Sequence, residues 1–110
     1  MVDSALLYAA SDSLKFKVSW VRVSAESEWT HFGTGDEVNR ALVTKTINEY
    51  FFADPLNVVF GRKDSVQINK SEINKVIHDA LGKRNFFIWD KEFKRAIEFN
   101  HIGVLRVGYI

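Results

Sequence analysis

Two pairs of carboxylates are the side chains in this sequence best spaced for acid–base chemistry. Asp36 is next to Glu37, and Asp90 lies close to Glu92. Paired carboxylates can act as general acid and general base. Both pairs, however, fall where the surrounding pattern predicts that a helix begins, and carboxylates at such a position cap backbone N–H groups and complement the helix dipole. We therefore expect both pairs to be structural.

No other set of residues predicts catalysis or metal binding. His31, His78 and His101 are far apart in the sequence, none has a second ligand at a metal-binding spacing, and there is no cysteine. No serine stands in a G-x-S-x-G context. An enzyme would need several titratable groups that converge in one pocket. We expect a protein that is not an enzyme and that holds no metal or cofactor.

A glycine-containing segment precedes the first predicted helix. Gly33, Thr34 and Gly35 could offer backbone N–H groups to a phosphate. Asp36 and Glu37 would repel an anion from the same place, and no lysine completes a phosphate loop. Thr34 with Glu37 three residues later fits a capping box instead. We therefore predict that Thr34 caps a helix here.

Basic and aromatic residues are close together near position 87. Lys83 and Arg84 precede the run 86–89, which is rich in aromatic residues, and such an arrangement could bind single-stranded nucleic acid. The run is apolar on both parities, whereas a stacking sheet needs its aromatic residues on one face only. The net charge of +1, from 15 basic and 14 acidic residues, gives no global attraction to nucleic acid. Nucleic-acid binding through Lys83, Arg84 and residues 86–89 remains the alternative function.

Composition bounds the size and the class of the protein. The 110 residues, 46% of them apolar, suffice for a single domain, residues 1–110, with its own core. No window approaches a membrane span, and an acidic residue near the N-terminus replaces the basic ones of a secretory signal. The absence of cysteine gives no sign of an oxidising compartment. We expect a soluble protein in the cytoplasm.

Hydrophobic periodicity predicts an α+β fold. Residues 5–10 form an apolar segment whose type the pattern does not settle. Alternation or apolar runs predict strands at residues 14–24, 28–32, 57–61, 65–69, 85–89 and 104–109. Helical spacing and caps predict helices at residues 34–53, 69–81 and 90–100. The order ββ-α-ββ-α-β-α-β implies a mixed, largely antiparallel sheet of about five to six strands with three helices, in which residues 85–89 and 104–109 are the central strands.

Protein recognition is the function that the remaining surface residues favour. An aromatic side chain among carboxylates suits a basic partner surface, although a solvated face with one core tryptophan explains the same residues equally well. A second and less specific acidic surface lies around Asp54, Asp64 and Glu72. The predicted partner-binding residues are Glu26, Glu28, Trp29, Asp36 and Glu37.

The C-terminal third adds a resemblance. Residues 87–93 (FIWDKEF), 95–100 (RAIEFN) and 102–104 (IGV) resemble small immunity proteins of bacterial contact-dependent growth inhibition (CDI) systems, the CdiI group. The resemblance implies a partner, the C-terminal toxin domain of CdiA, which in many of these systems is a nuclease. It implies a monomer or a heterodimer with the toxin, and it carries over no fold and no binding residue. Because this chain is not markedly acidic, we expect either a local acidic patch or binding away from the toxin's active site.

Overall fold

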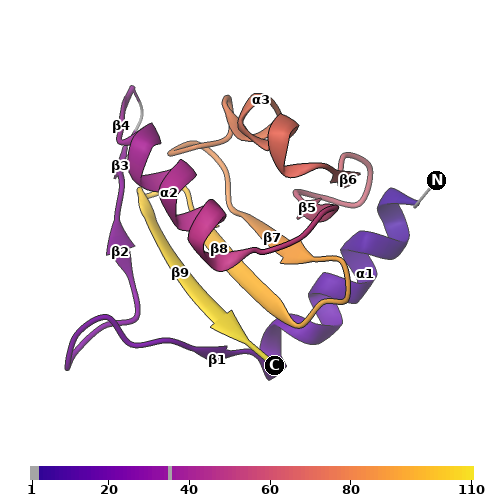
Figure 1. Ribbon diagram of the computed structural model, residues 1–110, viewed down its shortest axis with the longest axis horizontal. Coiled ribbons are helices and arrows are strands. Elements are labelled where there is room, and N and C mark those ends of the chain that lie inside the picture. Colours follow the sequence, from indigo (N-terminus) through magenta and orange to yellow (C-terminus); the bar gives the residue numbers. More distant parts are fainter. Residues whose placement is uncertain (1–2, 35) are drawn as a thin grey trace.

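One antiparallel sheet organises the chain (Figure 1). The computed structural model describes residues 3–34 and 36–110, and seven strands of this part form the sheet. Their order across the sheet is β1–β9–β8–β7–β5–β6, and β2 also pairs with β9. These strands are β1 (Ser19–Trp20), β2 (Thr30–His31), β5 (Leu56–Val59), β6 (Val66–Ile68), β7 (Phe86–Asp90), β8 (Arg95–Asn100) and β9 (Val104–Tyr109). A separate hairpin joins β3 (Gly33–Thr34) and β4 (Glu37–Val38).

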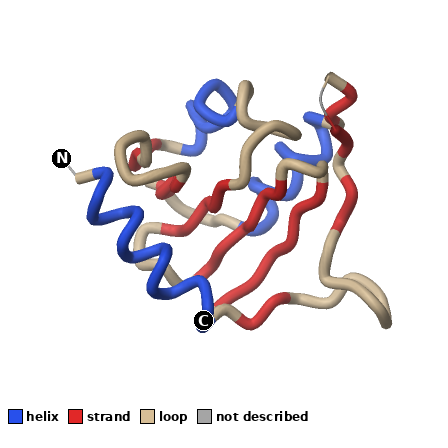
Figure 2. The backbone as a smooth tube through the Cα atoms, turned by 180° about the vertical axis from the view of Figure 1, so that it is seen from behind, coloured by secondary structure: helices blue, strands red, loops and turns tan. Residues whose placement is uncertain are grey.

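Three α-helices of the described residues pack on the two faces of the sheet. They are α1 (Ser4–Leu14), α2 (Arg40–Tyr50) and α3 (Ile73–Ile77), and short 3-10 turns stand at η1 (Lys15–Lys17) and η2 (Lys70–Glu72). Helices α2 and α3 cover one face, which we call the front face, and α1 crosses the opposite, back face (Figures 1 and 2). The predicted α+β class, with three helices on a largely antiparallel sheet, is confirmed. The strand number is slightly higher than predicted, and the element order differs.

The N-terminal residues account for the first difference in order. Residues 5–10, whose type the apolar pattern left open, belong to α1, and the Asp3 carboxylate accepts a hydrogen bond from the Ala5 N–H at 2.9 Å to cap it. On the buried side of this helix, the Trp89 indole N–H donates to the Ser11 hydroxyl at 2.8 Å. Leu7 packs with Trp89 and Ala96 of the sheet. These contacts fix α1 to the back face.

The predicted pairing of strands 14–24 and 28–32 is wrong. Only Ser19 and Trp20 of the first segment are in a strand, and both β1 and β2 pair with β9 rather than with each other. β9 is six residues long, and the two short strands pair with different parts of it: Ser19 lies opposite Tyr109, and Thr30 lies opposite Leu105. The Val21 N–H still donates to the Val107 carbonyl of β9 at 2.8 Å, and residues 22–29 then leave the sheet as a strap between two points of the same strand.

The helix predicted from Thr34 begins later. Gly33 has a φ of 112° and turns the chain into the β3–β4 hairpin, so Thr34 belongs to a strand and does not cap a helix. Asn39 is the cap, because its side-chain oxygen accepts a hydrogen bond from the Leu42 N–H at 3.0 Å. Gly35 lies outside the described residues. From Arg40 to Tyr50 the predicted helix is confirmed.

The helix predicted at residues 90–100 is also wrong, since this segment forms β8. The Asp90 carboxylate caps a turn instead of a helix, accepting hydrogen bonds from the N–H groups of Lys94 at 2.7 Å and Arg95 at 3.1 Å. Ile97 then lies between Ile88 of β7 and Val107 of β9. The predicted strands at 57–61, 65–69, 85–89 and 104–109 are confirmed as β5, β6, β7 and β9, and the helix at 69–81 is shortened to η2 and α3.

Most of the core lies between the front face and helices α2 and α3. Ile47 and Ile77 of these helices meet Val58, Ile88 and Ile97 of the sheet. Since β7 also buries Trp89 on the back face, it is an interior strand covered on both sides, as predicted. Within the described residues, no helix has the length and apolar character that a membrane crossing requires.

Candidate functional site

Arg106 lies on the back face and contacts two of the five predicted partner-binding residues, Glu28 and Trp29. Its guanidinium donates hydrogen bonds to carboxylate oxygens of Glu28 at 3.0 Å and Glu98 at 2.8 Å. The same guanidinium lies over the indole rings of Trp20, at 4.1 Å, and Trp29, at 4.5 Å. The Glu28 carboxylate is thus paired inside the protein, and Trp29 is half-buried against the sheet.

The other three predicted residues lie elsewhere. Glu26 is exposed in the strap of residues 22–29, whereas Asp36 and Glu37 are exposed at the β3–β4 hairpin. The strap and the hairpin stand at opposite ends of β2 (Figure 1). The structure brings Glu28 and Trp29 together and does not join the predicted carboxylates in one acidic patch.

A hollow on the back face is the candidate binding site. Helix α1 crosses one part of this face, and no described helix lies in front of the rest (Figure 2). The hollow has a volume of about 340 Å³, and we call it the aromatic groove. It is lined by Lys15, Phe16, Trp20, Asn85, Phe87, Glu98 and Arg106.

Local sequence explains how the aromatic rings reach this groove. Phe16 projects from η1 and is 83% exposed. Phe87 has the opposite parity to Phe86 and Ile88, so its ring faces back while theirs face the front core. Trp20 packs over Gly108, where an added Cβ would lie 2.8 Å from the indole. Only glycine therefore allows β1 and its tryptophan to lie so close to β9.

The charged groups that line the groove are paired within the chain. The Lys15 ammonium lies 2.8 Å from the Asp12 carboxylate. Arg106 is paired with Glu98 at 2.7 Å and with Glu28 at 3.0 Å. Each of these charged groups thus has a partner of opposite sign, with two carboxylates sharing the single guanidinium of Arg106, and three of the seven lining residues are aromatic.

A smaller hollow of about 160 Å³ adjoins the aromatic groove along α1. The two hollows share Lys15, Asn85 and Phe87 in their linings. The side-chain oxygen of Asn85 accepts a hydrogen bond from the His101 N–H at 2.8 Å, which fixes the amide at the junction. The recessed surface therefore continues from the exposed Phe16 toward Tyr8 of α1.

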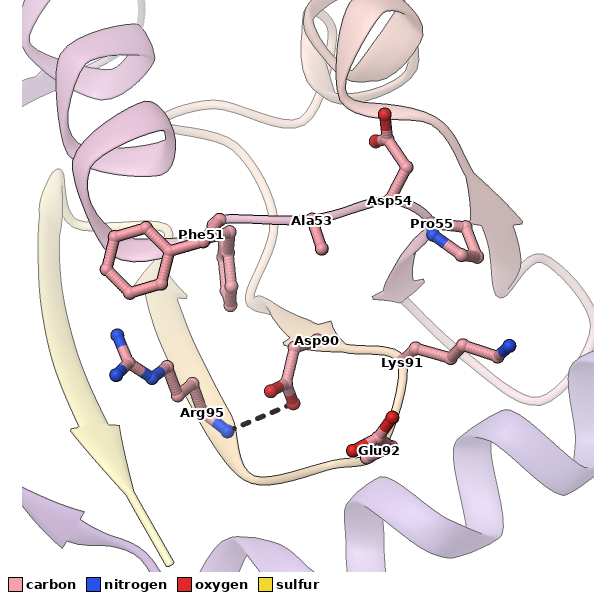
Figure 3. Close-up of a pocket in the computed structure, with 9 residues that line it drawn as sticks. Phe51, Ala53, Asp54, Pro55, Asp90, Lys91, Glu92 and Arg95 are labelled. Atoms are coloured by element: carbon pink, nitrogen blue, oxygen red, sulfur yellow. Dashed lines mark hydrogen bonds between the residues drawn. The ribbon is translucent and has the colours of Figure 1, made fainter.

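A third hollow, of about 240 Å³, lies at the edge of the front face (Figure 3). It has titratable side chains, the feature that an enzyme would need, but its carboxylates do not converge. The Asp54 carboxylate points away from Asp90 and Glu92 (Figure 3) and accepts a hydrogen bond from the Lys70 N–H, while Asp90 holds the β7–β8 turn. The lining residues are Phe51, Phe52, Ala53, Asp54, Pro55, Asp90, Lys91, Glu92 and Arg95.

Arg95 and the aromatic rings beside it organise this third hollow. The guanidinium donates to the Tyr50 carbonyl at 3.2 Å and lies over the ring of Phe52 at 4.7 Å. Burial raises the pKa of the Tyr50 phenol, an effect opposed by the positive charge of Arg95 and assisted by Asp90. The Tyr50 hydroxyl donates to the Gly108 carbonyl. Arg95 and Tyr50 thus tie the end of α2 to the sheet.

The residues of the predicted nucleic-acid site are distributed between core and surface. Phe86 and Trp89 are buried, and Phe87 is half-buried. Arg84 pairs with Asp64 at 2.7 Å, and the hydrogen bond from Arg84 is the main cause that lowers the pKa of the Asp64 carboxyl. Because their rings are in the core, Phe86 and Trp89 cannot stack on a base while the sheet is intact.

The second acidic surface and the histidines form no joint site. Asp54, Asp64 and Glu72 take part in separate turns. Across residues 3–34 and 36–110, no group of three or more His, Cys, Asp or Glu side chains is arranged to hold a metal ion. Comparison of the chain with protein-family models, curated proteins and solved structures gave no match.

Sequence reasoning missed the main components of the aromatic groove. Alternation predicts a strand at residues 14–24, although Phe16 stands on an exposed 3-10 turn. The apolar run 86–89 predicts a buried strand, but Phe87 is only half-buried. The lysines on both sides of Phe16 are a weak signal of exposure, but nothing local marks Arg106 as the partner of Glu28.

Proposed function

We propose that this chain is an immunity protein of a CDI system, which binds the C-terminal toxin domain of CdiA in the cytoplasm and neutralises it by occlusion. The toxin domain in this proposal is a nuclease. The resemblance of residues 87–104 to the CdiI group supplies the partner. The aromatic groove supplies the physical reason to expect a protein partner.

The aromatic groove is the single observation that carries the proposal. Interfaces concentrate their binding energy in a few tryptophan, tyrosine and arginine residues near the centre of the contact. Trp20, Trp29 and Arg106 stack together on the back face, and Phe16 stands beside them at 83% exposure. Such a ring is normally buried, so a partner that covers it would gain hydrophobic stabilisation.

The nucleic-acid alternative receives less support. Its predicted stacking rings include Phe86 and Trp89, which are buried, and its Arg84 is already paired with Asp64. If nucleic acid were the ligand, affinity would fall steeply with salt, because binding to phosphates releases counterions. A titration of single-stranded RNA and DNA at low and high salt separates this function from the proposed one.

The decisive experiment pairs this chain with the toxin domain encoded beside its gene. The two purified proteins should elute together in size-exclusion chromatography and bind with a Kd of about 1 nM, in the range of tight standard-size interfaces. Expression of this chain should also restore growth to cells that produce the toxin. If the adjacent toxin domain neither binds nor is neutralised, the immunity function is refuted.

A further inference from the structure

We infer that the aromatic groove receives an uncharged, apolar side chain of the toxin domain, from a part of the toxin outside its cationic substrate cleft. This inference rests on the proposed function and specifies the chemistry of the partner surface. It implies that the affinity of this chain for the toxin domain depends little on the salt concentration. It also implies that neutralisation does not rely on an acidic mimic of nucleic acid.

The paired charges around the groove are the first argument. Lys15 is neutralised by Asp12 at 2.8 Å, and Arg106 by two carboxylates at 2.7 and 3.0 Å. An aspartate side chain that entered the groove would be repelled by the excess carboxylate charge around Arg106, and a lysine side chain would lose its hydration next to carboxylates that are already hydrogen-bonded to Arg106. An apolar side chain has no such cost. The lack of an unpartnered charge in the lining thus favours a neutral group.

The shape and the rings of the groove are the second argument. Its volume of about 340 Å³ is in the lower range of ligand pockets and leaves room for a leucine or phenylalanine side chain. Phe87 and Trp20 are half-buried in the lining, and Phe16 stands free at the rim. A side chain inserted between them would contact aromatic rings on several sides, the packed environment in which interface hot spots occur.

The other strongly exposed phenylalanine provides a contrast. Phe52 is 73% exposed, but its ring is covered by the Arg95 guanidinium at 4.7 Å and it borders the hollow that contains Asp54, Asp90 and Glu92. A basic nuclease cleft would be expected to dock there, with a steep dependence on salt. Phe16 and Phe52 therefore report on two different docking surfaces.

The first test measures toxin binding for the wild type and the variants Phe16→Ala and Phe52→Ala. Both side chains are exposed, so neither substitution should unfold the protein, which circular dichroism verifies. We expect Phe16→Ala to weaken binding about 30-fold, in the range of an interface hot spot, and Phe52→Ala to change it less than about twofold. Raising the salt from 0.1 to 0.5 M should change the wild-type Kd less than about threefold.

Other results of the same binding experiment would refute the inference about the groove without refuting the proposed immunity function. If the toxin binds but Phe52→Ala is the damaging variant, or if the affinity falls more than about tenfold with salt, the groove is not the docking surface and the immunity function still stands. If the toxin does not bind at all, the immunity function fails, and the chemistry of the groove is decided by a probe that needs no toxin.

That probe is a titration with capped amino acids followed by NMR. The indole N–H signals of Trp20, Trp29 and the buried Trp89 are separate reporters, and the last serves as an internal control. N-acetyl-phenylalanine amide should shift the Trp20 signal, and this shift should be lost in Phe16→Ala and kept in Phe52→Ala. Equal shifts from the lysine or glutamate derivatives, or no shift from the phenylalanine derivative, would overturn the inference.

Discussion

Replacing Arg106 with methionine is the most informative perturbation of this fold. Methionine keeps an unbranched apolar stem but removes the guanidinium from two carboxylates and two indole rings. The Glu98 and Glu28 side chains are only 20% and 33% exposed. Both would be left as partly buried carboxylates without the cation that now compensates them.

The loss of stability expected for Arg106→Met follows from the intermediate burial of these two carboxylates. Breaking a fully buried ion pair costs about 3–5 kcal/mol, and an exposed pair contributes about 0–1 kcal/mol. A cost of about 2 kcal/mol lies between these limits, and loss of the stacking contacts adds about 1 kcal/mol. A total of about 3 kcal/mol corresponds to a decrease of about 12 °C in Tm for a domain of this size.

Urea unfolding and amide hydrogen exchange measure this effect. Residues 22–29 make backbone hydrogen bonds only within the strap, as between Val23 and Ser27, so their exchange should accelerate in Arg106→Met. The control is Lys17→Met, which removes an exposed cation beside Phe16. If Arg106→Met were no more destabilising than this control and left exchange in the strap unchanged, the role assigned to Arg106 would be wrong.

Three further predictions address other contacts. Ser11→Ala should leave the buried Trp89 N–H without its acceptor and lower the free energy of unfolding by about 1–3 kcal/mol; an unchanged urea midpoint would contradict this. Gly108→Ala should displace Trp20, because the new Cβ would lie 2.8 Å from the indole, and the near-ultraviolet circular dichroism should change accordingly. Burial raises the pKa of Tyr50, so the folded state favours the neutral phenol; the resulting stabilisation is complete below the unfolded-state pKa of about 10 and is lost as the pH rises through the folded-state pKa. Tyr50→Phe should therefore unfold with a weaker pH dependence in this alkaline range than the wild type, as followed by urea titration.

Some helices and strands depend mainly on the hydrophobic pattern of their own residues, and these could be predicted from the sequence. Residues 85–89 are apolar on both parities, which indicates an interior strand, and β7 is buried on both faces. The stripe that includes Val43 and Ile47 is typical of a helix with one buried side, and α2 buries both residues. In these segments the local pattern and the tertiary environment agree.

The segment 90–100 shows why other elements could not be predicted. Phe93, Ala96 and Ile97 have helical spacing, but Ala96, Ile97 and Phe99 are also all buried in a central strand. The deciding factor is the position of β8 between β7 and β9, whose residues cover Ile97 from both sides. A pattern read along the chain contains no information about such neighbours.

The candidate site depends even more on distant residues. Arg106 and Glu28 are 78 positions apart, and their pairing exists only because β2 and β9 are neighbours. The sequence does indicate Trp29 and Glu28 as surface candidates. It cannot indicate that an arginine neutralises Glu28, nor that Phe16 stands at the rim of the hollow that these contacts border.

The pairing of β1 and β2 with β9 has a consequence for the time at which the sheet can be completed. A ribosome makes residues 104–109 after residues 19–31, so the two early segments remain without their partner strand until β9 has been made. Chains grow at about 5–20 residues per second, and the strap can close only after Arg106 has left the exit tunnel. A translation product interrupted before β9 would carry Trp20 and Trp29 without the strand that they pack on, and we expect it to be degraded by proteases.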